Sequence, residues 1–228
     1  MSSGSADAPV GSTALRVDTV VGEALAVVNA GGLESLTMRR LAERLGAHLP
    51  TIYRLVDGKD ALIDEMAETI LAHALSRCSP AEQSGWEHHI VGHARGLRSA
   101  LLAQRDGARI VGGNYAAKHA NLTYVDSLVG CMRDAGLGGE HALWAASSVF
   151  CYVLGEVLEQ QGARGEENET LHRVVQAGRY RHLASSPVQR LLDFDARFDF
   201  GLRLLIAGMH ASPGVGSSGV GGATDAGP

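Results

Sequence analysis

The first segment rich in side chains that could take part in binding chemistry runs from Thr37 to Lys59. This segment reads TMRRLAERLGAHLPTIYRLVDGK and carries five basic side chains against two acidic ones, a net charge of +3. The whole chain of 228 residues carries −5, so the remainder carries −8. Hydroxyl and guanidinium groups on a short helix can donate hydrogen bonds to phosphates and to base edges. This charge distribution therefore indicates a local DNA-reading head on an acidic body.

A second group of reactive side chains is a run of histidines at His88, His89 and His93. His89 and His93 are four residues apart and share one face of a helix, a spacing that can hold a metal ion. No acidic or cysteine side chain stands at a matching position nearby, so we interpret the histidines as surface or pocket-lining residues. No metal site is predicted.

Signatures of catalysis are absent from the sequence. It contains no GxSxG, Walker A or HExxH motif, and the glycine-rich Gly136–Gly139 follows no strand, as a dinucleotide loop would require. Glu156 and Glu159 lie in an apolar segment, where paired or rim carboxylates at a dimer interface are a better interpretation than buried catalytic acids. We therefore predict neither an enzyme nor a cofactor.

The elements that must position the basic segment are helices. The pattern is helical throughout the folded part, so the predicted fold class is all-α. Thr37 is expected to cap a short helix that Gly46 ends, and Pro50 fits the first turn of another short helix. Two short helices joined by a tight glycine turn fit a helix-turn-helix, whose second helix enters the major groove. A plain helical hairpin with a solvated polar face fits the same spacing, and the residues alone leave both open.

Downstream, the pattern predicts a longer helix after Asp57-Gly58 and further helices near residues 86–104, 106–112, 118–135, 140–161, 169–184 and 196–210. The 140–161 helix is apolar on so much of its circumference that it must be buried on several sides. With 196–210 it could form a dimer interface or an ordinary core, and the pattern alone leaves both open.

Composition excludes several classes of protein. No window reaches 18 consecutive apolar residues, which argues against a membrane span, and three distant cysteines without a CxxC argue against a disulfide framework or structural zinc. Residues 1–13 show no signal sequence, so a cytoplasmic location is expected. Residues 1–13 and 211–228 are rich in small residues and are expected to be disordered.

The segment SLTMRRLAERLGAHLPTIYRLVDGKDALID resembles the DNA-binding domain of the tetracycline-repressor (TetR) family. Three later stretches, LLAQRDGARIV, ALWAASSVFCYVLGEVLEQQ and ARFDFGLRLLIAGM, resemble the ligand-binding domain of the same family, in the same order. The resemblance covers Leu15 to His210. It implies a DNA-binding domain at 14–60, a three-helix helix-turn-helix unit, followed by a helical ligand-binding and dimerisation domain at 61–210, with about nine to ten helices.

The resemblance also implies a function. It predicts a homodimeric repressor that binds a palindromic operator in double-stranded DNA, with its two recognition helices one DNA turn apart, and that a small-molecule inducer releases. An efflux or resistance gene is the expected target. The DNA contacts would come from Thr37, Arg39, His48, Leu49, Pro50, Thr51, Tyr53, Arg54 and Lys59.

Two departures from the family concern the ligand. Leu75 and Val111 stand where tetracycline-responsive members have histidines, one of which holds magnesium, and His93 stands at the position of a pocket asparagine. We therefore expect a more apolar inducer, such as a polycyclic or polyketide-like drug, rather than a magnesium–tetracycline complex. The predicted pocket residues are Leu75, His93, Leu97, Val111, Asn114, Tyr115, Leu143, Ala146 and Ser147.

The predicted dimer seam consists of Val153, Val157, Phe198, Leu202 and Leu205. Two other functional classes remain open from the residues themselves. One is a helical small-molecule-binding protein or enzyme without operator binding. The other is a DNA-binding activator or architectural protein without a ligand.

Overall fold

A computed structural model describes residues 15–78, 85–163 and 167–212. Over these residues the chain forms eleven α-helices and two short 3-10 helices, and no strand. The predicted all-α class is confirmed. The predicted disordered ends at 1–13 and 211–228 lie outside the described residues, apart from positions 211 and 212.

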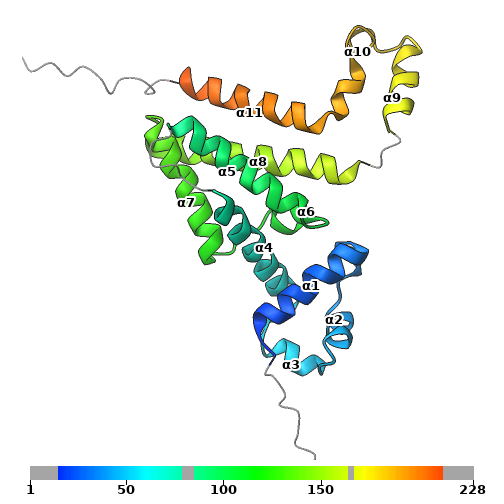
Figure 1. Ribbon diagram of the computed structural model, residues 1–228, viewed down its shortest axis with the longest axis vertical. Helices are drawn as coiled ribbons and strands as arrows, with labels where there is room; N and C mark the ends of the chain where they lie inside the picture. Colours follow the sequence, from blue (N-terminus) through cyan, green and yellow to red (C-terminus); the bar gives the residue numbers. More distant parts are fainter. Residues whose placement is uncertain (1–14, 79–84, 164–166, 213–228) are drawn as a thin grey trace, which may run out of the picture.

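A small head at one end of the molecule contains the first helices (Figure 1). They are α1 (Val17–Gly31), η1 (Leu33–Ser35), α2 (Met38–Arg44) and α3 (Leu49–Tyr53). The predicted local signals hold: the Thr37 hydroxyl accepts from the backbone N–H of Arg40 at 3.1 Å and caps α2, and Gly46 turns the chain with a φ of 58°.

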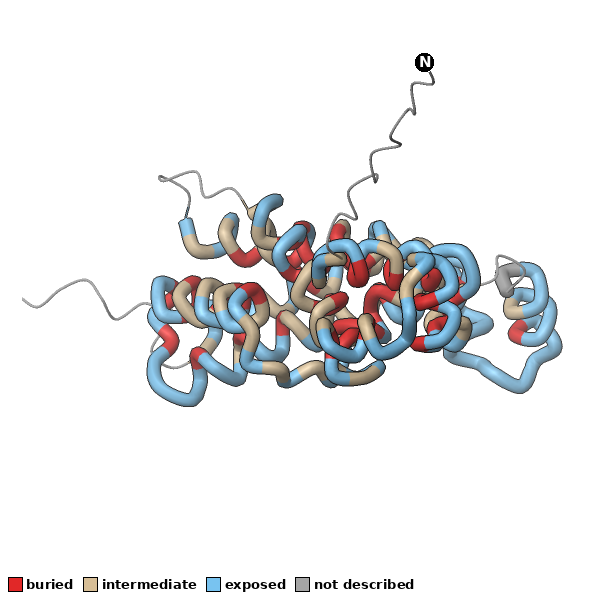
Figure 2. The backbone as a smooth tube through the Cα atoms, turned by 90° about the horizontal axis from the view of Figure 1, so that it is seen from below, coloured by how far each residue is buried: buried red, intermediate tan, exposed pale blue. Residues whose placement is uncertain are grey.

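The body begins with α4 (Gly58–Arg77), which runs out of the head and into the bundle (Figure 1). The remaining bundle helices pack around α4 and each other, with their buried positions turned towards the middle (Figure 2). They are α5 (Trp86–Leu102), α6 (Gly107–Val111), α7 (His119–Asp134), α8 (Gly139–Gly162) and α11 (Phe194–His210).

The prediction of one continuous helix at 169–184 is wrong. The segment instead forms α9 (Glu167–Gln176) and α10 (Arg181–Ala184), followed by η2 (Val188–Leu192). Gly178 has a φ of 91°, a left-handed conformation that a continuous α-helix cannot contain. These elements project beyond the body as an arm (Figure 1), and α9 packs against η2 and α10.

By length and composition alone, α8 could cross a membrane, with a mean hydropathy of 1.3 over its most apolar window. It is the one such helix in the described part of the chain, and a core helix meets the same criteria. The sequence test for consecutive apolar residues did not show this. In the fold, α8 packs against α5, α6, α7 and α11, but only 28% of its most apolar window is buried, and Trp144 and Leu158 are exposed. The prediction that this helix is buried on several sides therefore holds for only part of its circumference.

The predicted dimer seam needs correction. Val153, Val157, Phe198 and Leu202 are all buried within the single chain, and Leu205 is half-buried. The four buried residues belong to the inner faces of α8 and α11 and are not available to a second subunit, whereas Leu205 lines a shallow groove beside Leu204 and stays a prediction. Helical periodicity identifies an apolar stripe, but on a helix that is apolar nearly all round it does not say which stripe faces its own core.

The outer face of the same helix pair is the one left open. Trp144 on α8 and Leu204 on α11 are 57% and 58% exposed and line one shallow groove together with Ser148 and Gly208. Phe200, four residues before Leu204, is exposed on the same helix. This outer face, defined by Trp144, Ser148, Phe200, Leu204 and Gly208, is an exposed apolar surface of the pair within the described residues.

Candidate nucleic-acid interface and ligand cavity

The head presents the predicted DNA contacts on its surface. Ile52 is fully buried and Val56 is 4% exposed, so they anchor α3 from beneath and leave its other side open. Eight of the nine predicted contact residues are exposed, and Thr51 is half-buried. The exposed residues are Thr37, Arg39, His48, Leu49, Pro50, Tyr53, Arg54 and Lys59.

Local contacts orient several of these side chains. Nη2 of Arg54 donates to the hydroxyl of Thr51 at 3.3 Å, which brings two hydrogen-bonding groups together beside α3. Arg39 is paired with Glu43 at 3.1 Å on exposed α2, a pair that a phosphate can replace at little cost. Tyr53 is 47% exposed, and its hydroxyl can donate a hydrogen bond to a phosphate.

One helix joins this surface to the body. Lys59 lies in the first turn of α4, and Leu75 and Arg77 lie in its last turn. Twenty residues at 1.5 Å each make a rod of about 30 Å. One continuous helix therefore connects the head to the body.

A second connection between head and body was not found from the sequence. The backbone N–H of Leu33 in η1 donates to Asp106 Oδ2 at 2.7 Å, and the N–H of Arg105 donates to Asn29 Oδ1 at 2.8 Å. Arg109 also pairs with Glu34. Asp106 has a φ of 58°, a left-handed conformation that aspartate tolerates better than most residues. That conformation turns the chain between α5 and α6 towards the head.

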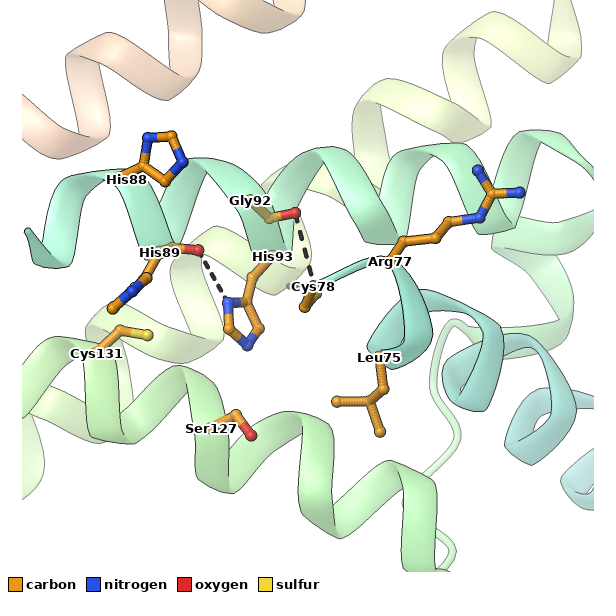
Figure 3. A pocket seen from close by; sticks show the side chains of 9 residues that line it. All are labelled: Leu75, Arg77, Cys78, His88, His89, Gly92, His93, Ser127 and Cys131. Carbon is orange, nitrogen blue, oxygen red and sulfur yellow. Dashed lines mark hydrogen bonds between the residues drawn. The ribbon is translucent and has the colours of Figure 1, made fainter. Parts of the chain in front are cut away.

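The body contains a cavity of about 440 Å³ between the last turn of α4, the start of α5 and the middle of α7 (Figure 3). Its volume suits a drug-sized molecule. Nine residues line it: Leu75, Arg77, Cys78, His88, His89, Gly92, His93, Ser127 and Cys131.

His93 is fixed within this cavity. Its Nδ1 lies 2.9 Å from the carbonyl oxygen of His89, and its ring meets Tyr124 edge-on at a centroid distance of 5.8 Å. The hydroxyl of Tyr124 donates to the carbonyl of His93 at 3.0 Å. Burial lowers the pKa of His93 below its usual value; the hydrogen bond with the His89 carbonyl opposes this effect, and the charge of the His89 imidazole adds to it. The imidazole is therefore neutral at pH 7.

The two thiols of the cavity are also uncharged at neutral pH. Burial raises the pKa of Cys78 to about 11, with a further contribution from Cys131. Burial likewise raises the pKa of Cys131, and Asp134 adds to this. Cys78 Sγ donates to the carbonyl of Ala74 at 3.3 Å. Both side chains behave as small polarisable apolar groups rather than as nucleophiles.

Of the predicted ligand residues, the structure brings Leu75 and His93 to this cavity. Leu97, Val111 and Ala146 are buried in the core away from its lining, and Asn114 Nδ2 donates to Asp64 at 3.0 Å. The others lie on the outside of the chain, where Tyr115 is 95% exposed and Leu143 and Ser147 are exposed on α8. The ligand-binding roles of all nine residues stay predictions.

Sequence reasoning did not place Arg77, Cys78, Gly92, Ser127 or Cys131 in a ligand cavity. The signal that could have found two of them is the i, i+4 spacing of Ser127 and Cys131, which puts both on one face of α7. Across the residues that the structure describes, no three His, Cys, Asp or Glu side chains are arranged to hold a metal ion.

An acidic row on α4 holds the segment between α6 and α7. Glu65 pairs with Lys118 at 2.9 Å, and Glu68 accepts from the backbone N–H groups of Ala120 and Asn121 at 2.5 and 3.0 Å. A carboxylate at these N–H groups caps the start of α7. The α7 wall of the cavity is thus tied directly to α4.

Comparisons with known proteins agree with this arrangement. A family model for bacterial regulatory proteins of the tetR family matches residues 21–66, and one for the C-terminal domain of tetracyclin-repressor-like proteins matches residues 79–212. Tetracycline repressor protein class E from Escherichia coli is 33% identical over 197 residues, which cover 86% of this chain and 92% of that protein.

Solved structures are similar over the same span. A possible TetR family transcriptional regulator from Streptomyces coelicolor A3(2) has 38% identity and a TM-score of 0.78, covering 86% of this chain and 98% of that one. The Streptomyces coelicolor TetR family protein ActR, in complex with actinorhodin, has 29% identity and a TM-score of 0.79, covering 91% of this chain and all of that one.

Proposed function

Because the chain belongs to the tetR family of bacterial regulatory proteins, we propose that it represses transcription as a homodimer on a palindromic operator until a small molecule enters its cavity and releases it. The observation that carries this function is the position of α4. Its first turn bears Lys59 beside the DNA-reading surface, and its last turn bears Leu75 in the wall of the cavity.

At the operator, α3 enters the major groove. Arg54, which the Thr51 hydroxyl holds beside α3, reads a base edge, and guanine is the base that a guanidinium binds best. Leu49 at the start of α3 packs on a thymine methyl, while Tyr53 and Lys59 bind phosphates. The contacts of Thr37, Arg39, His48, Pro50 and Thr51 complete this surface.

Release follows from differential binding. A ligand between α4, α5 and α7 presses on the last turn of α4 and moves its first turn with it. The acidic row of α4 and the Leu33–Asp106 hydrogen bond transmit the same displacement to the α6–α7 segment and to η1. Two heads that no longer stand one DNA turn apart bind the operator less tightly, so ligand and operator weaken each other's binding.

The homodimer forms through the outer face of α8 and α11. Trp144 and Leu204 are large, exposed and adjacent, and the small Ser148 and Gly208 beside them allow the helices of a second subunit to approach closely. Phe200 extends the same face. Aromatic and leucine side chains in such a position are those that an obligate interface buries.

The remaining features of the proposal concern domains and setting. We assign DNA binding to residues 14–60 and ligand binding with dimerisation to 61–210. The regulated gene is one for efflux or drug resistance, the protein acts in the cytoplasm, and it has no catalytic activity and no cofactor. The inducer is a small molecule that is more apolar than a magnesium–tetracycline complex, such as a polycyclic drug.

The test is fluorescence anisotropy on labelled DNA from the intergenic region beside the gene, with a scrambled competitor of the same length. We expect selective binding that weakens steeply with salt, because phosphate contacts release counterions. Polycyclic drugs are then titrated into the complex. Binding of the scrambled DNA with equal affinity would overturn the repressor function and favour a small-molecule-binding protein without an operator.

A further inference from the structure

The tautomer of His93 specifies what the cavity can bind. A carbonyl oxygen only accepts hydrogen bonds, so the 2.9 Å contact with the His89 carbonyl requires that Nδ1 of His93 carries the proton. In the neutral imidazole Nε2 is then an acceptor. Figure 3 shows this second nitrogen directed into the open space between Leu75 and Ser127.

Among the residues that the structure describes, no charged side chain points into that space. Arg77 and His88 line the cavity at its rim, and their side chains point away from it (Figure 3). The Arg77 guanidinium donates instead to the Ser99 hydroxyl at 3.1 Å. The described part of the lining contains no carboxylate, whereas magnesium and calcium ions prefer oxygen ligands. A ligand with a net charge or a bound hard cation would therefore lose its hydration without compensation.

The remaining walls suit an aromatic ring. Gly92 offers a flat backbone surface, since a Cβ there would meet nothing within 4 Å. The Cys78 and Cys131 thiols are polarisable and favour contact with ring edges.

We propose that the cavity takes an uncharged hydroxyaromatic molecule whose O–H donates to Nε2 of His93, and that it requires no metal ion. The proposal rests on the proposed role of the cavity as the inducer site and specifies the chemistry of the inducer. It makes His93 the residue that distinguishes a phenol from its ether. The burial that keeps His93 neutral supports the assignment.

The test compares three matched probes by equilibrium dialysis against the intact protein without DNA: 9-phenanthrol, 9-methoxyphenanthrene and phenanthrene-9-carboxylate. The phenol should bind about tenfold more tightly than the ether, because the ether leaves the buried acceptor of His93 unpaired. The carboxylate should bind about a hundredfold more weakly than the phenol, because its charge is desolvated. EDTA should change none of the three affinities.

Two variants assign the effect to His93. In His93→Leu the phenol and the ether should bind equally, whereas His172→Leu, at an exposed position of α9 outside the cavity lining, should preserve the difference. The ratio between the two probes remains readable even if a variant loses some stability. Equal binding of phenol and ether to the parent protein, tighter binding of the carboxylate, dependence on a metal ion, or no binding of any probe would each overturn the proposal.

The outcome is separable from that of the proposed function. Equilibrium dialysis measures ligand binding to the cavity without DNA, and anisotropy measures binding to operator DNA. A phenol preference in a protein that binds no operator would refute the repressor and leave the ligand assignment standing. Selective operator binding by a protein with no preference for the phenol would support the repressor and refute the ligand assignment.

Discussion

Gly201 on α11 lies against the ring of Tyr152 on α8, so closely that a Cβ at position 201 would meet the Tyr152 hydroxyl oxygen at 2.4 Å. That hydroxyl donates to the carbonyl of Phe198 at 2.8 Å, and the rings of Tyr152 and Phe198 stack at 5.7 Å. Arg197 adds an ion pair with Glu156 at 2.8 Å. The glycine is thus what lets α8 and α11 pack as one unit.

Gly201→Val should destabilise the protein. The added side chain must displace Tyr152 from its hydrogen bond, and overpacking of this kind costs about 1–3 kcal/mol. Thermal unfolding followed by circular dichroism should show a midpoint several degrees lower. Gly130→Ala on α7 is the matched control, because a Cβ there meets nothing within 4 Å and alanine favours a helix. A Gly201→Val melting curve that superimposes on that of the parent would contradict the packing described.

The reading head gives a prediction about specificity. Arg54→Ala should lower discrimination at one operator position by about 1–3 kcal/mol, since a bidentate base contact is lost. Lys59→Ala should weaken binding to all sequences alike and reduce the salt slope by about 1. Anisotropy with single-base operator variants at several salt concentrations measures both. Arg179→Ala in the arm is the control, and the placement of α3 would be wrong if Arg54→Ala behaved like it.

The outer face of α8 and α11 predicts which residues hold two subunits together. Leu204→Asp should convert the dimer to a monomer, because it places two carboxylates in an apolar interface. Sedimentation equilibrium gives the mass directly. Leu122→Asp on α7 replaces a leucine of similar exposure, 56% against 58%, and should leave the dimer intact. A Leu204→Asp protein that remains dimeric would place the interface elsewhere.

The connection between Leu33 and Asp106 predicts a change in local opening. Asp106→Ala removes the acceptor of the Leu33 amide and should increase hydrogen exchange across η1, whereas Asp106→Asn retains an oxygen and tolerates the left-handed backbone. Hydrogen exchange read by mass spectrometry distinguishes the two variants. Equal protection of η1 in Asp106→Ala and the parent would show that the hydrogen bond does not tie head to body.

Local signals explain why the head could be predicted from its sequence. Thr37, Gly46 and Pro50 each act on their own neighbours, so capping and turn chemistry could be read residue by residue. The body could be predicted only as a set of helices. Gly178 shows the limit: a single left-handed residue splits a segment whose apolar periodicity continues on both sides.

Contacts between distant segments explain what the sequence did not show. The cavity depends on how α4, α5 and α7 come together, and Cys78 and Cys131 carry no motif that indicates a shared wall. Likewise, Val153 and Phe198 have the same apolar character as Trp144 and Phe200. Only the packing of α8 on α11 separates the inner pair from the outer one.

The thiol of Cys78 gives a prediction about reactivity. Burial raises its pKa to about 11, so the thiolate is scarce at neutral pH and alkylation should be slow. The rate with iodoacetamide should rise about tenfold per pH unit and continue to rise beyond pH 9, because the thiolate fraction increases until the pKa is reached. Peptide mapping by mass spectrometry follows this site separately from Cys131 and Cys151, and circular dichroism confirms that the protein remains folded. Glutathione, treated in parallel, serves as the unburied thiol and should level off near its own lower pKa. A Cys78 profile that levels off together with that of glutathione would show that the thiol is not desolvated in the cavity wall.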